Sequence, residues 1–197
     1  MKIVIGTLAV TLIAGLVAGL LIIQAGMFNV STTWQDPAVW RWLLTTVREE
    51  SIERRSAGIE IPDLAARAMI TRGFQSYRDM CAGCHGKPGG APSPLAQGLN
   101  PPPPDLSDPE YKESTREVFW VVKNGIRMTG MPGWGATHSD DALWDIVAFV
   151  NALPGITPAE YRAMESESPE GHHHSHEHQA DAGNASLHTP MEDHHTH

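Results

Sequence analysis

The chain has 197 residues and a formal net charge of −9, from 14 basic and 23 acidic side chains. This length favours one folded domain with extensions over two full domains. Nucleic-acid binding requires a basic face, so the acidic balance argues against that class of function. The charge is unevenly placed: seven acids and no Lys or Arg lie between Glu165 and His197, whereas residues 63–154 carry ten acids and eight bases and are close to neutral.

Residues 1–24 are predicted to form a transmembrane anchor. No charged residue occurs from Ile3 to Ile23, and at about 1.5 Å per residue this helix would span about 30 Å, the thickness of a bilayer core. The run is longer than the apolar part of a cleaved signal peptide, and no Ala-x-Ala-like site follows it, which favours an uncleaved helix. Lys2 precedes the run, so the positive-inside rule places everything after Gln24 outside the cytoplasm.

Residues 25–62 are predicted to be a linker that contains an amphipathic helix. Asp36-Pro37 is typical of a helix start, with Asp as the cap, and Gly58 is the expected end. Four apolar residues at helical spacing form a stripe: Trp40, Leu43, Leu44 and Val47. The stripe could lie on the membrane surface, or it could pack on the following domain or on a partner subunit. We favour packing.

Residues 63–156 are predicted to form the main domain. Its first helix is expected to open at Ile61-Pro62-Asp63 and to run to about Met80. A loop rich in Gly and Pro follows at 86–109, where the prolines hold the chain extended. No clear strand is predicted.

Two further helices are expected in this domain. The pattern Ser114-Thr115-Arg116-Glu117 is a capping box, which predicts a helix that ends at Gly125. A Gly-rich loop covers 128–137, and a last helix should begin at Ser139 and end before Pro154. The order of elements indicates an all-α fold.

The two cysteines of the chain lie in one motif, Cys81-Ala82-Gly83-Cys84-His85, which is typical of covalent haem attachment. In a helical turn Cys81 and Cys84 share one face, so both thiols can add to the vinyl groups of one porphyrin while His85 binds the iron. A thioredoxin-like pair would need a βαβ context, a disulfide would leave His85 unexplained, and a zinc knuckle would need two more ligands. The motif therefore predicts one covalent haem c.

This region resembles the class I cytochrome c family. The resemblance runs from about Leu64 to Pro154 and rests on Gly73 and Tyr77, on the attachment motif, on the Met-Pro pair that follows Gly125, and on the helix at 143–150. It implies the class I fold, in which the first and last helices cross at a small residue that aromatic side chains face. The residues similar to those positions are Gly73, Tyr77, Trp144 and Phe149.

The beginning of the chain is similar to a subgroup of bacterial monohaem cytochromes with an uncleaved anchor. The matching residues are those at 26–30 and Trp42-Leu43-Leu44. This likeness implies the bacterial inner membrane as the location, with the main domain and the C-terminus in the periplasm.

The same resemblance implies a methionine as the second axial ligand of the iron, in a loop between two helices. Met131 is the predicted ligand because Pro132 stiffens its loop. Met128 and, through a bis-His site, His138 are the alternatives. The family also implies that a carbonyl of a proline-containing loop orients the ligand His85, and the candidates are Pro88, Pro92 and Pro94.

The last segment, residues 157–197, is predicted to be a disordered acidic tail because it has almost no large apolar residues. Nine of the eleven His of the chain lie in it. Such His-rich tracts bind Cu, Zn or Ni through neutral imidazole. The candidate metal ligands are His172, His173, His174, His176 and His178. A soluble acidic tail with no metal role in the cell is the alternative.

Taken together, these features predict an electron carrier and not an enzyme. A single attachment site argues against a di-haem peroxidase. The expected function is to carry single electrons on the periplasmic side between respiratory or oxidoreductase partners. Two alternatives remain open: a fixed cytochrome c subunit of a larger membrane redox complex, and a metal-handling or sensor protein that uses the tail.

Overall fold

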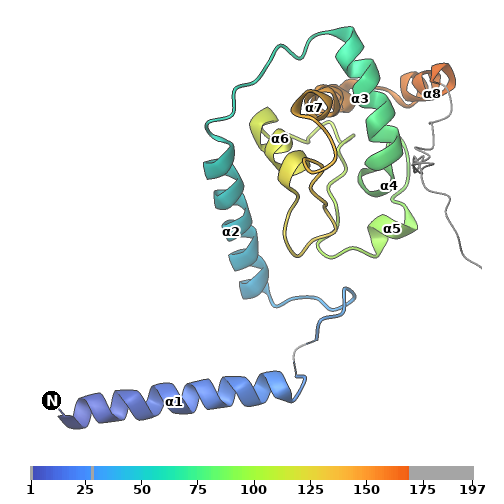
Figure 1. Ribbon diagram of the computed structural model, residues 1–197. Coiled ribbons are helices and arrows are strands. Elements are labelled where there is room, and N and C mark those ends of the chain that lie inside the picture. Colours follow the sequence, from blue (N-terminus) through green and yellow to red (C-terminus); the bar gives the residue numbers. More distant parts are fainter. Residues whose placement is uncertain (1, 28, 169–197) are drawn as a thin grey trace, which may run out of the picture.

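The computed structural model describes residues 2–27 and 29–168 (Figure 1). All regular elements in these ranges are helices, which confirms the all-α prediction. The elements are α1 (Lys2–Gln24), α2 (Ala38–Ser56), α3 (Arg67–Met80), α4 (Ala82–His85), α5 (Pro94–Gln97), α6 (Thr115–Asn124), α7 (Asp140–Ala152), the 3₁₀ turn η1 (Leu153–Gly155) and α8 (Pro158–Glu167).

Helix α1 is a candidate membrane span. It has 23 residues, none of them buried, and it is the one helix of the described ranges that is long and apolar enough to cross a bilayer. In Figure 1 it stands apart from the helical body. A helix that leaves this much apolar surface uncovered needs an apolar surrounding.

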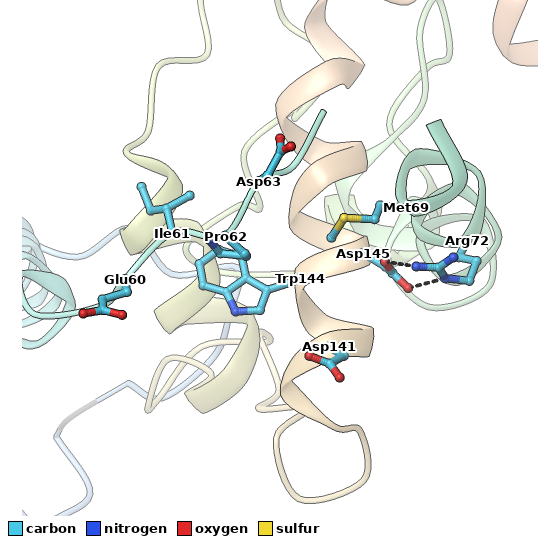
Figure 2. Close-up of a pocket in the computed structure, with 9 residues that line it drawn as sticks. All are labelled: Glu60, Ile61, Pro62, Asp63, Met69, Arg72, Asp141, Trp144 and Asp145. Carbon is cyan, nitrogen blue, oxygen red and sulfur yellow. Dashed lines mark hydrogen bonds and ion pairs between the residues drawn. The ribbon is translucent and has the colours of Figure 1, made fainter. Parts of the chain in front are cut away.

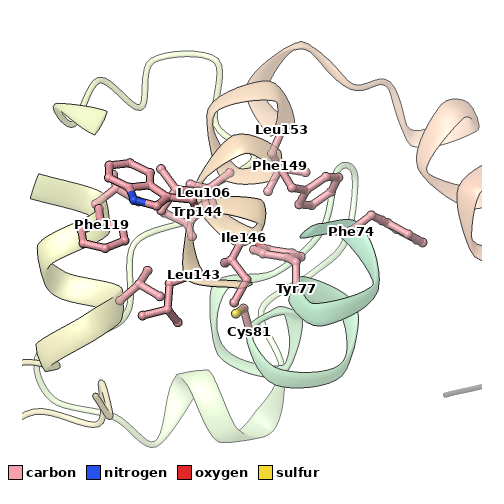
Figure 3. Close-up of a cluster of buried hydrophobic side chains, with 14 of the residues drawn as sticks. Phe74, Tyr77, Cys81, Leu106, Phe119, Leu143, Trp144, Ile146, Phe149 and Leu153 are labelled. Carbon is pink, nitrogen blue, oxygen red and sulfur yellow. The ribbon is translucent and has the colours of Figure 1, made fainter. Parts of the chain in front are cut away.

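The core is built where α3 crosses α7. Gly73 lies at the crossing, and a Cβ atom added there would be 1.9 Å from the carbonyl oxygen of Asp145. On the same side of α7, Phe149 contacts the rings of Phe74 and Tyr77 at centroid distances of 5.5 and 5.2 Å (Figure 3). The crossing that the family resemblance implies is therefore present.

Trp144 has a different role from the one expected at the crossing. Its ring stacks on Phe119 of α6, with centroids 3.9 Å apart and planes 13° apart. It therefore joins α7 to α6 (Figure 3). An ion pair supports the other side of α7: Arg72 donates two hydrogen bonds to the nearly buried carboxylate of Asp145, at 2.6 and 2.8 Å.

One predicted helix start and one predicted cap are wrong. Helix α3 begins at Arg67 and not at 61–63, because the carboxylate of Asp63 accepts a hydrogen bond from the amide of Ala65 at 3.0 Å. This local turn competes with a helical start. Helix α6 has Ser114 at its N-cap, but the side chain makes no capping bond, so the predicted capping box is absent.

The C-terminal end of α6 and both ends of α7 agree with the predictions from the sequence. Gly125 ends α6 with a φ of 69°, a left-handed conformation that glycine adopts without strain. The hydroxyl of Ser139 caps α7 by accepting a hydrogen bond from the amide of Ala142. Helix α7 ends at Ala152, two residues before Pro154.

Helix α2 lies along α6, as Figure 1 shows, but its predicted apolar stripe is not the face that packs. Thr45, Ile52 and Ser56, which share one face, are buried or half-buried, while the stripe residues Trp40, Leu43, Leu44 and Val47 are 40–58% exposed. The expected Asp cap is also absent, since Pro37 holds the N-cap position without a side-chain hydrogen bond. Packing of the helix is therefore observed, and packing of its stripe is not.

Helix α8 was not expected, because residues from 157 onward were predicted to be disordered. Thr157 and Glu160 form a complete capping box at its start. The ring of Tyr161 is buried and lies 5.3 Å from that of Phe74. The prediction is wrong at this boundary, and the main domain extends to Glu167. The tail beyond 168 lies outside the described residues.

Candidate haem site

The attachment motif forms the turn that follows α3. Cys81 is the C-cap of α3 and the N-cap of α4, and the amides of Cys84 and His85 both donate to its carbonyl oxygen, at 3.0 and 2.9 Å. This turn places the two thiols three residues apart, at the N-cap and within the short helix α4. Both are free in this structure. The predicted donors Cys81, Cys84 and His85 are therefore brought together.

Burial differs between the two thiols. Cys81 belongs to the hydrophobic core next to Tyr77, whereas Cys84 is half-buried. Burial, followed by the neighbouring Cys84, raises the pKa of the Cys81 thiol to about 12. The thiol is therefore protonated at neutral pH. This is the form whose S and H both add across a carbon–carbon double bond.

The ring of His85 is fixed by a backbone carbonyl. Its Nδ1 lies 2.9 Å from the carbonyl oxygen of Pro104, which can only accept, so Nδ1 carries the proton and donates. The other ring nitrogen, Nε2, is left with a free lone pair for a metal. Burial lowers the pKa of His85, and the Pro104 and Asp105 groups oppose this shift. The neutral imidazole that ligates iron is thus the favoured form.

The predicted carbonyl acceptors for His85, those of Pro88, Pro92 and Pro94, are wrong, because the acceptor is Pro104. One hydrogen bond brings the distant end of the Pro-rich loop back onto the motif, and a second joins α3 to the beginning of this loop. The amide of Leu106 donates to the carbonyl of His85 at 3.4 Å, and the hydroxyl of Tyr77 donates to the carbonyl of Gly86 at 2.8 Å. Leu106 itself is buried in the core.

Residues 92–97, in the earlier part of the loop, make other hydrogen bonds. Ser93 caps the short helix α5 and its hydroxyl also donates to the carbonyl of Gly83. The side chain of Gln97 donates to the carbonyl of Pro92 at 2.9 Å. The segment that contains the predicted acceptors Pro92 and Pro94 is therefore held by these bonds and not by a bond to His85.

The second predicted ligand, Met131, lies in a closed loop between α6 and α7. The amide of Ile126 donates to the carbonyl of Met131 at 3.1 Å, which closes the loop, and the hydroxyl of Thr129 accepts from the Met131 amide at 3.1 Å. A Cβ added at Gly125 would be 2.6 Å from the amide nitrogen of Gly133, so the two ends of the loop touch. The position of Met131 is therefore set by the backbone.

The three candidate second ligands have different surroundings. Met131 is half-buried and packs against the same core cluster that contains Cys81. Met128 is 88% exposed and has a φ of 61°. His138 lies edge-on to Trp134, with ring centroids 5.6 Å apart, and its Nδ1 is 2.9 Å from the hydroxyl of Thr137. Of the two methionines, Met131 is the one that packs against the core cluster.

The methionine loop also touches the loop that follows the attachment motif. A Cβ added at Gly130 would be 2.7 Å from a methyl carbon of Leu99. The residue after it, Asn100, donates from its side chain to the carbonyl of Trp34 at 3.2 Å. Both predicted ligand segments and the chain before α2 therefore meet on one side of the domain.

These residues fit a haem by their donor chemistry. Haem c is held by two thiols, an imidazole and often a thioether. The site offers the thiols of Cys81 and Cys84 on one turn, the His85 imidazole with its Nδ1 hydrogen-bonded, and the Met131 thioether packed against the core. Within the described ranges no group of three or more His, Cys, Asp or Glu side chains could hold a metal ion without such a cofactor. The candidate tail ligands His172, His173, His174, His176 and His178 lie outside the described residues.

A cleft of about 540 Å³ lies away from the attachment motif, between residues 60–63 and the α3–α7 crossing (Figure 2). Its wall contains the ion pair of Arg72 and Asp145, and the acids Glu60, Asp63 and Asp141 line it. It holds neither a cysteine nor a histidine. The cleft therefore has no part in the chemistry of the attachment site.

Comparison with protein families matches residues 68–150 to the family described as "Cytochrome C oxidase, cbb3-type, subunit III". The match begins in α3, includes the attachment motif and the methionine loop, and ends in α7. Comparison with curated protein sequences found no significant match.

Proposed function

We propose that this chain is a membrane-anchored c-type cytochrome that binds haem c and carries single electrons on the outer side of a bacterial inner membrane; the cytochrome family match over residues 68–150 supports this. The observation that carries the proposal is the attachment turn, in which Cys81, Cys84 and an oriented His85 lie together. The haem supplies one redox-active iron, which gains and loses one electron. The transfer partners are redox proteins.

In this proposal Cys81 and Cys84 each form a thioether. The sulfur bonds to one carbon of a vinyl group and the thiol hydrogen goes to the other carbon, so no atom is lost. His85 would hold the iron through Nε2 while Pro104 fixes Nδ1. Met131 would supply a thioether sulfur to the same iron, a ligand that raises the reduction potential. An iron that takes both of these ligands from the protein would leave no open position for a small substrate and would serve electron transfer.

The membrane part of the proposal rests on α1, whose length and composition suit a single span. Lys2 precedes the span, and the span itself carries no charge. By the positive-inside rule this arrangement favours a location of the haem domain on the outer side of the membrane. The near-neutral haem domain gives little long-range electrostatic steering, so partner docking would depend on short-range apolar contact.

A redox titration of the purified chain tests this function. We expect the spectrum of a haem c and a transition that fits one electron. The reduced protein should bind no carbon monoxide, because Met131 occupies the sixth position. Rapid carbon monoxide binding would point to an open iron site and to a sensor.

A fixed subunit of a larger redox complex is the second candidate. The description of the matching family, which names an oxidase subunit, favours it. Native electrophoresis of mildly solubilised membranes separates the two: a carrier migrates alone, whereas a subunit migrates with a larger haem-containing complex.

A further inference from the structure

Helix α2 has two faces of different character. Thr45, Ile52 and Ser56 share the face toward α6 and are buried or half-buried. The apolar stripe of Trp40, Leu43, Leu44 and Val47 lies on another side of the helix and is 40–58% exposed. Four large apolar side chains on one exposed face mark an interaction surface and not a solvated one.

Most charges of α2 near the stripe are basic. Arg54 follows Val47 by seven residues and Glu50 follows Leu43 by seven, so one base and one acid continue the stripe. Arg41 and Arg48, also seven apart, lie between the stripe and the packed face, and Arg48 pairs with Glu49 at 3.3 Å. Arginines therefore outnumber acids on and beside the exposed face, which is apolar and weakly basic and complements an anionic surface.

The chain before α2 keeps this face close to the candidate membrane span. The last turn of α1 ends at Gly26, and the carbonyl of Trp34 is held on the haem domain by the side chain of Asn100. At most about 28 Å of extended chain separates these two residues. Trp40 of the stripe is 48% exposed and Trp34, in the segment just before α2, is 52% exposed, and Trp favours the interface between membrane and water.

We infer that α2 lies in the headgroup region of an anionic phospholipid membrane, with the stripe turned into the lipid and α6 on its other side. The inference rests on the proposed anchoring of the chain by α1. It makes α2 a second membrane contact that fixes the orientation of the haem domain, because α1 and a short linker alone would leave the domain free to rotate.

The test uses the full, haem-loaded chain in vesicles that contain phosphatidylglycerol. A single thiol is added on the stripe by Leu44→Cys and is labelled with the fluorophore NBD. Cys81 and Cys84 do not react with the label, because their sulfurs are bonded to the haem. The matched control is Glu53→Cys, an exposed position off the stripe of the same helix. Quenching by lipids with a nitroxide on the acyl chain is then measured at each position.

We expect quenching at position 44 to exceed that at position 53 by at least about twofold, as for a helix face buried at the acyl boundary. Replacing phosphatidylglycerol by phosphatidylcholine, or Arg41 and Arg48 by Gln, should lower the value at 44 toward that at 53. Equal weak quenching at the two positions would overturn the inference, because the stripe would face water.

Two other outcomes also overturn it. A blue-shifted label at 44 that lipid does not quench, and that strengthens as the protein-to-lipid ratio rises, would mean that a second copy covers the stripe. A chain that does not float with the vesicles after an alkaline wash would refute the anchoring as well. The absorbance spectrum of the same sample reports the haem separately, so the cytochrome function is judged independently.

Discussion

The crossing of α3 and α7 gives the sharpest prediction about stability. In Gly73→Ala the new methyl carbon would lie 1.9 Å from the carbonyl oxygen and 2.7 Å from the carbonyl carbon of Asp145. Backbone atoms cannot move aside as a flexible side chain would, so the two helices must separate. Separation also lengthens the two hydrogen bonds between Arg72 and Asp145.

Overpacking of a core costs about 1–3 kcal/mol. Because the added methyl group at position 73 would clash with the backbone of Asp145, we expect the free energy of unfolding to fall by about 3 kcal/mol, at the upper end of this range. For a domain of this size the loss corresponds to a fall in Tm of about 12 °C or more. Urea and thermal unfolding of the detergent-solubilised chain, followed by near-ultraviolet circular dichroism, measure both quantities.

The matched control is Gly58→Ala, since a Cβ at Gly58 meets no atom within 4 Å. It should leave the stability within about 0.5 kcal/mol of the original chain. If Gly73→Ala proves as stable as Gly58→Ala, the close approach of the two helices is refuted.

Three further predictions concern the ligand loop and α8. Met131→Ala should abolish the sulfur-to-iron charge-transfer band of the oxidised protein, while Met128→Ala keeps it; the reverse result in absorbance spectra would assign the ligand to Met128. Thr157→Ala should lower the free energy of unfolding by about 1 kcal/mol in urea titrations, because it removes the cap of α8; an unchanged value would mean that α8 contributes nothing. The hydrogen bonds from Thr157 lower the pKa of Glu160 in the folded chain, so the stabilisation is present above the ordinary pKa of a glutamate and is lost as the pH falls through the lowered value. Glu160→Gln should therefore flatten the acid limb of a stability-against-pH curve, and an identical limb would count against the capping box.

Much of the fold could be predicted because the determining interactions are local in sequence. The hydroxyl of Ser139 reaches an amide three residues ahead, and Gly125 is needed at the left-handed end of α6. The crossing at Gly73 followed from the family resemblance, which no local rule supplies. The uncharged, mostly apolar run of α1 identified the candidate span by its length and composition.

The parts that could not be predicted depend on where distant segments return. The acceptor for His85 is Pro104, 19 residues away, and nothing in the sequence favours it over the nearer prolines. Helix α8 was hidden by the polar composition of the segment, although Thr157-Pro158 followed by Glu160 was a readable start signal. The exposure of the α2 stripe required the structure, because helical spacing identifies an apolar face and not what covers it.

The central claim is covalent attachment of haem at Cys81 and Cys84, and the intact mass of the denatured chain tests it most directly. The chain is expressed in a host that attaches haem and is compared with a variant that carries both Cys81→Ala and Cys84→Ala. We expect the original chain to retain one haem in mass and in colour under denaturing conditions, and the double variant to lose both. A colourless original chain with the mass of the polypeptide alone would contradict the account.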